Sequence, residues 1–128
     1  MKKLTLLLLL MVSTSVFAEW TVVGGVDGMT AYADSDSIKK KGTKVKMWSL
    51  FDYKTVQKFD NLSYLSSVTR NEYDCEEETR RMLDLHWYSG NMRQGDIVYS
   101  NTNIKRESKS IIPESTIEVL FKIACSNK

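Results

Sequence analysis

Histidine is nearly absent from this sequence, whose 128 residues contain only one, His86. A metal site built from several histidines therefore cannot form, and a serine-histidine-aspartate catalytic arrangement would depend on that single side chain. The chain also lacks the GxSxG turn of serine hydrolases and the glycine-rich loops that bind phosphates. These absences predict a protein that is not an enzyme and that uses no metal ion or cofactor.

Cysteine is scarce as well, with Cys75 and Cys125 as the only two. The chain contains no Cys-x-x-Cys pair, which argues against a redox pair or a thiolate metal site. We therefore expect a structural disulfide between Cys75 and Cys125, formed in an oxidising compartment. Closing a loop of roughly 50 residues would stabilise the fold by about 4 kcal/mol on the chain-entropy model.

Long apolar runs are missing after the first residues of the chain. The run Leu4–Val12 follows two lysines and precedes Ser13–Ala18, whose small residues suit cleavage, so residues 1–18 are predicted to be a signal peptide. This run is shorter than the roughly 20 apolar residues of a membrane span. The mature chain would begin at Glu19, which is not a lipid-bearing cysteine. We expect a single domain over 19–128, exported to the periplasm or the outer-membrane surface and not lipidated.

A strong net charge is also lacking. The formal net charge of the whole chain is +2, and Lys2 and Lys3 lie in the predicted signal peptide, so the mature chain is close to neutral. Proteins that bind nucleic acids rely on a positive field to neutralise phosphates. Nucleic acid is therefore not an expected partner.

The remaining sequence has the alternation of a β-rich domain. The clearest strand is Thr43–Tyr53, where both faces carry large apolar side chains, as expected of a central strand. A second long strand, Tyr64–Glu77, is expected to bend near Arg70-Asn71 because it exceeds the usual strand length. The other expected strands are Trp20–Val23, Thr30–Asp34, Arg80–Ser89 and Asp96–Ser100. Between them we expect a helical turn or tight connection at Ser35–Lys41, a loop at Lys54–Asn61 with Phe59 as its anchor, a turn at Gly90–Gly95 and a polar crossover at Asn101–Ser110.

One helix is expected at the end of the chain. The only proline, Pro113, is of the kind favoured at a helix start, and it precedes Glu114–Ser126. Apolar side chains recur there at helical spacing, and Cys125 lies in the same stripe. The predicted fold is therefore α+β: about six antiparallel strands, with one C-terminal helix packed on one face and tethered by the disulfide.

A single helix of this length can cover one face of such a sheet. Trp48 and Leu50 would then be exposed on the other face, which predicts a homodimer or a protein partner docking through the sheet. Alternatively, a face with Met82, His86 and Tyr88 could hold a small ligand, either haem or an apolar molecule, since all three residue types can bind haem iron. These three side chains could equally form part of the core or of the dimer face.

Two charged segments are candidate sites. The acidic run Glu72–Glu78 could form a cation site or a carboxylate pair, although a solvated segment is the simpler interpretation. The basic cluster Lys39–Lys46 could contact acidic host matrix, but no site is assigned to it.

Several short motifs together resemble the surface-adhesin protein E family over essentially the whole mature chain. The most specific is Glu72-Tyr73-Asp74-Cys75 with Cys125 near the end. The supporting matches are Trp20, Tyr32-Ala33-Asp34 with Ser37-Ile38, Val45-Lys46-Met47-Trp48 leading to Asp52-Tyr53, and Ser66-Ser67.

The resemblance implies a six-stranded antiparallel sheet, a C-terminal helix held on its concave face by a disulfide, and a dimer. Family members characterised as adhesins lie on the bacterial outer membrane and bind host proteins such as vitronectin and laminin. The expected function is therefore that of an exported, non-catalytic adhesin-like protein that contacts host matrix proteins. The alternative is a periplasmic protein that binds a small ligand.

Overall fold

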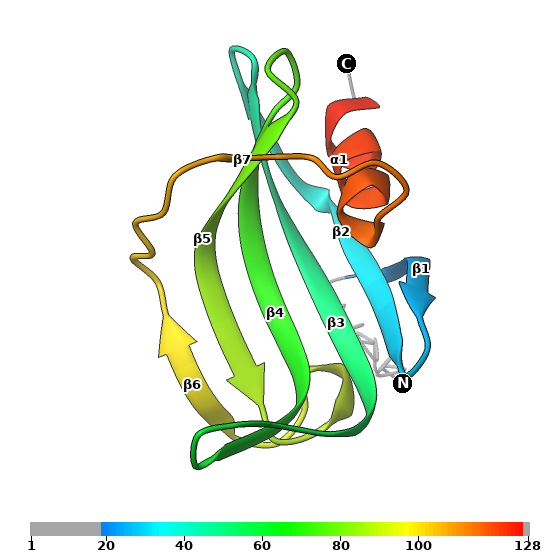
Figure 1. The fold of residues 1–128 in the computed structure, drawn as a ribbon, viewed down its shortest axis with the longest axis vertical. Helices are drawn as coiled ribbons and strands as arrows, with labels where there is room; N and C mark the ends of the chain where they lie inside the picture. Colours follow the sequence, from blue (N-terminus) through cyan, green and yellow to red (C-terminus); the bar gives the residue numbers. More distant parts are fainter. Residues whose placement is uncertain (1–18, 127–128) are drawn as a thin grey trace, which may run out of the picture.

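The protein is an antiparallel sheet with one helix on its face. The computed structural model describes residues 19–126, so the predicted signal peptide lies outside the described residues. Six strands pair in chain order, β1-β2-β3-β4-β5-β6, and a short β7 pairs with β5 (Figure 1). The elements are β1 Thr21–Val26, β2 Met29–Lys41, β3 Lys44–Phe59, β4 Leu62–Asp74, β5 Thr79–Tyr88, η1 Asn91–Arg93, β6 Ile97–Asn101, β7 Lys109–Ser110 and α1 Thr116–Ser126. The predicted fold class is confirmed.

Two segments expected to leave the sheet instead continue as strands. The helical turn expected at Ser35–Lys41 is wrong, because β2 runs to Lys41 with an irregularity between Asp34 and Lys39. Five residue steps on β2 are matched there by two on β3, from Trp48 to Lys46, so β2 contains three extra residues. The Ser37 hydroxyl accepts a hydrogen bond from the Trp48 backbone N–H at 2.9 Å. A side chain thus satisfies a strand N–H that the bulge leaves without a ladder partner.

The loop expected at Lys54–Asn61 is also wrong, because β3 extends to Phe59. Between Asp52 and Gln57, five steps on β3 are matched by two on β4, which again gives three extra residues. A bulge of this kind bends a strand and increases its twist. The β3–β4 hairpin therefore curls across the end of the sheet, as Figure 1 shows.

We expected a bulge or bend near Arg70-Asn71 of β4, and the β4–β5 register does shift between these two residues, although the insertion is on the partner strand. Arg70 is paired with Asp84 and Asn71 with Met82, so the extra residue, Leu83, lies on β5. Residues directly opposite each other on paired strands share a face of the sheet. The bulge therefore places Met82 and Asp84 on different faces, although strict alternation would put them on the same one.

Helix α1 begins at Thr116, two residues later than expected. Glu114 has a φ of 61°, a left-handed conformation that interrupts a helix. The Ser115 hydroxyl accepts a hydrogen bond from the Glu118 N–H at 3.2 Å. Ser115 is therefore the N-cap, and the Glu118 carboxylate accepts a hydrogen bond from the Glu114 N–H at 3.4 Å, one residue before the cap. Pro113 precedes this cap and does not open the helix.

The first of two hydrophobic cores lies between α1 and the sheet. Leu120 and Ala124 of α1 are fully buried against Val45, Met47 and Tyr73 of the sheet. Cys75 and Cys125 form the predicted disulfide at the edge of this core, with Cα atoms 5.6 Å apart. The helix contacts β1 to β4, on the β1 side of the sheet in Figure 1. The helix therefore covers little of the sheet near β6.

The second core lies on the opposite face and corrects one expectation. Leu50 and Val68 are buried there at 0% and 4% exposure, so the prediction of an exposed Leu50 is wrong. Trp20, Trp48 and Met92 pack on this core. The segment containing η1 covers it because the Asp52 carboxylate accepts a hydrogen bond from the Met92 N–H at 2.8 Å. Short irregular segments of the protein thus cover much of the face that was expected to bind a partner.

Trp48 itself is half-buried on that face. The Arg70 guanidinium lies 5.6 Å from the centre of its indole ring and also pairs with the Asp84 carboxylate. The His86 ring stacks on the same indole at 5.9 Å. Much of the aromatic surface expected to bind a partner is therefore covered by the protein's own side chains.

Candidate functional site

The largest group of interacting aromatic rings lies outside both cores. We call it the aromatic cluster, and its members are Tyr53, Phe59, Tyr64, Trp87 and Tyr99. Trp87 is at the centre: its ring stacks on Tyr64 at 4.3 Å and contacts Tyr99 at 4.9 Å and Phe59 at 5.6 Å, measured between ring centroids. Tyr53 meets Tyr64 edge to face at 5.8 Å. Each such contact is worth about 0.5–1.5 kcal/mol beyond area burial, so the cluster supports its own geometry.

Strand pairing and the β3 bulge bring these rings together. Trp87 and Tyr99 are directly opposite each other on β5 and β6, so their side chains share a face. Trp87 is also directly opposite Ser67 of β4, and Ser67 is directly opposite Phe51 of β3. Phe51 packs against the core beneath α1, so Trp87 lies on the helix-bearing face as well. The curled β3–β4 hairpin then brings Phe59 onto Trp87. The aromatic cluster thus occupies the helix-bearing face, on the strands that α1 leaves uncovered.

The aromatic cluster remains accessible to a partner. The Phe59 side chain is 60% exposed and Tyr99 is 36% exposed, while the other three rings are half-buried. Burial raises the pKa of the Tyr53 hydroxyl, with a further contribution from the neighbouring Tyr64, and burial also raises the pKa of Tyr64. Both hydroxyls therefore stay neutral around pH 7 and can donate hydrogen bonds. Rigid rings with neutral polar ends are the side chains that dominate protein-binding surfaces.

The three residues proposed for a small ligand do not converge. Met82 is directly opposite Asn71, on the helix-bearing face, whereas His86 is opposite Val68 on the other face. His86 Nδ1 and the Ser100 hydroxyl are 2.7 Å apart, so one of the two donates a hydrogen bond to the other. Tyr88 is buried in the second core. The expectation that Met82, His86 and Tyr88 share one face is therefore wrong, because the β5 bulge moves Met82 to the other side.

A pocket does lie on the face that carries His86 and Tyr88. Its volume is about 280 Å³, and it is lined by Trp20, Asp34, Trp48, Val68, Tyr88 and Arg93. Of the three proposed residues only Tyr88 lines it. The walls are largely aromatic, with one carboxylate and one guanidinium, which is a typical composition for a small-molecule site.

The Glu72–Cys75 motif has a structural role at each position. Tyr73 is fully buried in the first core and packs near Phe121 of α1. The Glu72 carboxylate accepts a hydrogen bond from Arg81 at 3.1 Å. The Asp74 carboxylate accepts hydrogen bonds from the backbone N–H groups of the following turn, chiefly that of Glu77, which lowers the Asp74 pKa. The motif therefore holds the β4–β5 turn and the disulfide in place.

The acidic run Glu72–Glu78 does not gather its carboxylates at one point. Among residues 19–126, no group of three or more His, Cys, Asp or Glu side chains is placed to hold a metal ion.

Within the same residues, no helix is long and apolar enough to cross a membrane.

The aromatic cluster was not identified from the sequence as a site. The signal was present in part, because Phe59 is a lone aromatic in a polar segment and Trp87 lies in an alternating strand. What the sequence did not predict was the register that sets Trp87 opposite Tyr99 and the three-residue bulge in β3. Both depend on long-range register.

These features define a class: a small antiparallel-sheet domain with a disulfide-tethered helix and an exposed aromatic surface. A family model described as "Surface-adhesin protein E" matches residues 20–126. The chain belongs to this surface-adhesin protein E family.

Solved structures of Haemophilus influenzae protein E have the same fold. One, described as crystal form II, aligns with a TM-score of 0.67 at 18% identity and covers 89% of this chain and 92% of its own. A second, from a non-typeable strain, aligns with a TM-score of 0.64 at 18% identity over 89% of this chain and 80% of its own. At this identity the likeness concerns the fold alone. No curated protein matches the sequence.

Proposed function

We propose that this protein is an exported, non-catalytic adhesin-like binding protein that contacts a protein partner through the aromatic cluster. Membership of the surface-adhesin protein E family supports the adhesive role. The single observation that carries the assignment of the surface is the exposure of Phe59 and Tyr99 around the central Trp87. Exposed aromatic surface that the monomer does not cover marks interaction sites.

The proposed partner is a host extracellular-matrix protein, and the proposed location is the outer-membrane surface. The cell surface is the decisive condition, because a periplasmic protein could not reach such a partner. Whole cells treated with protease should lose the protein while a periplasmic marker stays intact. If the protein resists protease until the outer membrane is opened, the adhesive function is excluded.

The binding surface can be tested with two pairs of exposed residues. Phe59→Ser with Tyr99→Ser removes the accessible part of the cluster, and Val22→Ser with Val26→Ser removes apolar side chains of comparable exposure on β1, at the other edge of the sheet. We expect the first pair to weaken binding to immobilised vitronectin or laminin by about tenfold or more, since a hot-spot side chain contributes about 2 kcal/mol. The second pair should change affinity less than about twofold. Equal losses in both pairs would show that the cluster is not the contact surface.

We also propose a homodimer through the sheet, in which a second copy would occupy the aromatic cluster in competition with a host protein. Because Leu50 is buried and Trp48 is half-buried, the aromatic cluster is the better candidate for self-association on the sheet than the face originally expected. Light scattering at high micromolar concentration should give twice the mass of the chain. The Phe59→Ser and Tyr99→Ser variant should shift to monomer. A monodisperse monomer of the unaltered protein would exclude the dimer.

The second candidate function is binding of a small apolar molecule in the 280 Å³ pocket beside Trp48 and Tyr88. A ligand entering it would contact the indoles of Trp20 and Trp48, so tryptophan fluorescence reports occupancy directly. Haem is less well suited, because Met82 and His86 lie on opposite faces of the sheet. Purified protein that shows neither a Soret band nor a saturable fluorescence change with small apolar compounds would exclude this candidate.

A further inference from the structure

A groove lined almost entirely by lysines lies at the end of the β2–β3 hairpin. Its volume is about 350 Å³, and its walls are formed by Lys39, Lys40, Lys41, Lys44, Lys46 and Glu72. We call it the lysine groove. Lys46 lies two residues before Trp48 on β3, so the groove lies on the face opposite α1. It is separate from the aromatic cluster, which lies on the helix-bearing face.

The lysines of the groove form an ordered array. Lys39 is directly opposite Lys46, and Lys41 is directly opposite Lys44, so two like-charged pairs follow each other along the hairpin. Successive pairs on one face are two residues, or about 7 Å, apart along a strand. A loop with scattered lysines would not hold its charges at such a repeat.

This array is neutralised only on its β4 side, where Glu72 is directly opposite Lys46 and Asp74 is directly opposite Lys44. Lys39 and Lys41 pair only with β3 and face no carboxylate across a strand. Among residues 19–126, the only lining lysine in an ion pair is Lys44, whose Nζ lies 3.9 Å from the Glu72 carboxylate. Arg81 pairs with the same carboxylate at 3.1 Å, so Glu72 is shared between two cations. Like charges directly opposite on paired strands destabilise a sheet. The hairpin therefore carries an electrostatic cost that an anionic ligand would relieve.

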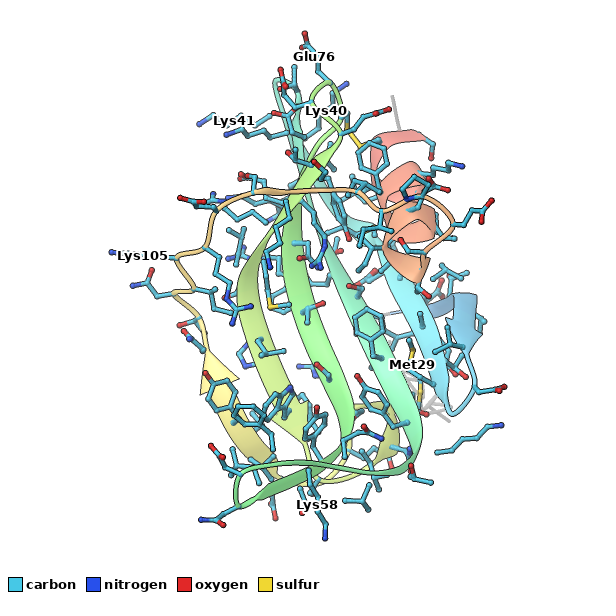
Figure 2. All side chains as sticks on the ribbon, in the orientation of Figure 1. Met29, Lys40, Lys41, Lys58, Glu76 and Lys105 are labelled. Carbon is cyan, nitrogen blue, oxygen red and sulfur yellow. A yellow bond between two sulfur atoms is a disulfide. The ribbon has the colours of Figure 1, made fainter. Side chains whose placement is uncertain are left out.

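The surroundings indicate which kind of anion fits. The β4–β5 turn carries Glu76, Glu77 and Glu78, and Figure 2 shows Glu76 at the same end of the molecule as Lys40 and Lys41. A flat anionic membrane approaching this end would meet the glutamates together with the lysines. A narrow chain lying along the groove meets the lysines and avoids the turn.

We propose that the lysine groove binds a linear sulfated polysaccharide, whose repeating sulfate groups pair with the two rungs Lys39–Lys46 and Lys41–Lys44. Sulfate esters remain ionised at all physiological pH values, and ammonium groups at this spacing can contact successive anionic groups of one chain. Glu72 at the base of the groove repels the same chain and limits its affinity. The site acts independently of the protein contact proposed for the aromatic cluster.

The test compares matched lysine variants for binding to a heparin oligosaccharide. Lys39→Gln with Lys46→Gln removes one rung. Lys54→Gln with Lys58→Gln makes the same charge change on the β3–β4 hairpin, and Figure 2 shows Lys58 at the opposite end of the molecule. At physiological salt we expect the rung variant to lose at least about tenfold in affinity and the control less than about twofold. The slope of log affinity against log salt should also fall by about two in the rung variant, one for each lysine removed.

A second variant should bind heparin more tightly. Glu72→Gln keeps an acceptor for Arg81 and removes the repelling charge, so heparin affinity should rise several-fold. The rung variant removes both the Lys39–Lys46 repulsion and the attraction between Lys46 and Glu72 across β3 and β4, so its melting temperature should stay close to that of the unaltered protein; an unchanged melt separates loss of binding from loss of folding. Phe59→Ser with Tyr99→Ser should bind heparin unchanged, which separates this site from the protein contact.

Four results would each overturn the proposal. The first is an equal loss of heparin affinity in the rung variant and the control, and the second is no gain in affinity from Glu72→Gln. The third is equally tight binding of a hyaluronan oligosaccharide, which carries carboxylates and no sulfates. The fourth is binding to phosphatidylserine vesicles that depends on the rung lysines and matches binding to heparin. The last result would assign the groove to an anionic membrane.

Discussion

Removing the disulfide should destabilise the protein through its unfolded state and leave the folded structure largely unchanged. The variant is Cys75→Ser with Cys125→Ser. The bond joins residues 50 positions apart, and releasing a loop of that length costs about 4 kcal/mol in the chain-entropy model. That is a large part of the roughly 5–15 kcal/mol by which a small domain is stable.

The helix should nevertheless stay docked in the folded variant. Leu120 and Ala124 remain fully buried against Val45 and Met47 without the bond. Burial of one leucine side chain is worth about 1.5–3 kcal/mol. We therefore expect the far-ultraviolet circular dichroism of the native variant to match that of the unaltered protein.

Urea unfolding measures the effect directly. The free energy of unfolding should fall by about 4 kcal/mol, and the m-value should rise because the unfolded chain without a crosslink exposes more surface. Reduced and alkylated unaltered protein provides the matched control and should behave as the double variant does. A fall of less than about 1 kcal/mol, or a loss of helical signal before the main transition, would refute this reasoning.

The remaining predictions concern single side chains and pH. The Tyr73 hydroxyl is buried without a hydrogen-bond partner among the described residues, so Tyr73→Phe should leave stability unchanged or raise it by up to about 1 kcal/mol in thermal melts. Ser37→Ala should cost about 1–3 kcal/mol in urea unfolding, because the Trp48 N–H then loses its acceptor; a cost below experimental error would contradict this role of the bulge. The lowered pKa of Asp74 contributes stability at neutral pH that is lost as pH falls through that pKa, so Asp74→Asn should flatten the acid limb of a melting-temperature profile. The raised pKa of Tyr53 acts in the opposite direction: its contribution should be lost above about pH 10, so Tyr53→Phe should flatten the alkaline limb.

Local pattern was sufficient to predict the architecture. Alternation in Thr43–Tyr53 identified the central strand, helical spacing identified the C-terminal helix, and the only two cysteines could form only one internal bond. These inferences succeeded because burial periodicity and redox chemistry are carried by near neighbours and by composition. The helix start was missed by two residues, because the left-handed Glu114 and the Ser115 cap compete with proline as a start signal.

The location of an exposed binding surface could not be predicted in the same way. Three extra residues in β3 carry Phe59 onto Trp87, and one extra residue in β5 separates Met82 from His86. A bulge leaves the local sequence β-like while it shifts every side chain beyond it to the other face. Strict alternation therefore assigned faces correctly only as far as the first bulge.

The sequence by itself determined a sheet with one helix and the disulfide that tethers them; export and a near-neutral mature chain stay predictions. Only the tertiary structure decided which apolar side chains were left for a partner. Leu50 is covered by the segment containing η1, whereas Phe59 and Tyr99 remain exposed beyond the end of α1. The reason is physical. Composition determines how much apolar surface the chain carries, whereas strand register and the length of one short helix determine which part of that surface stays exposed.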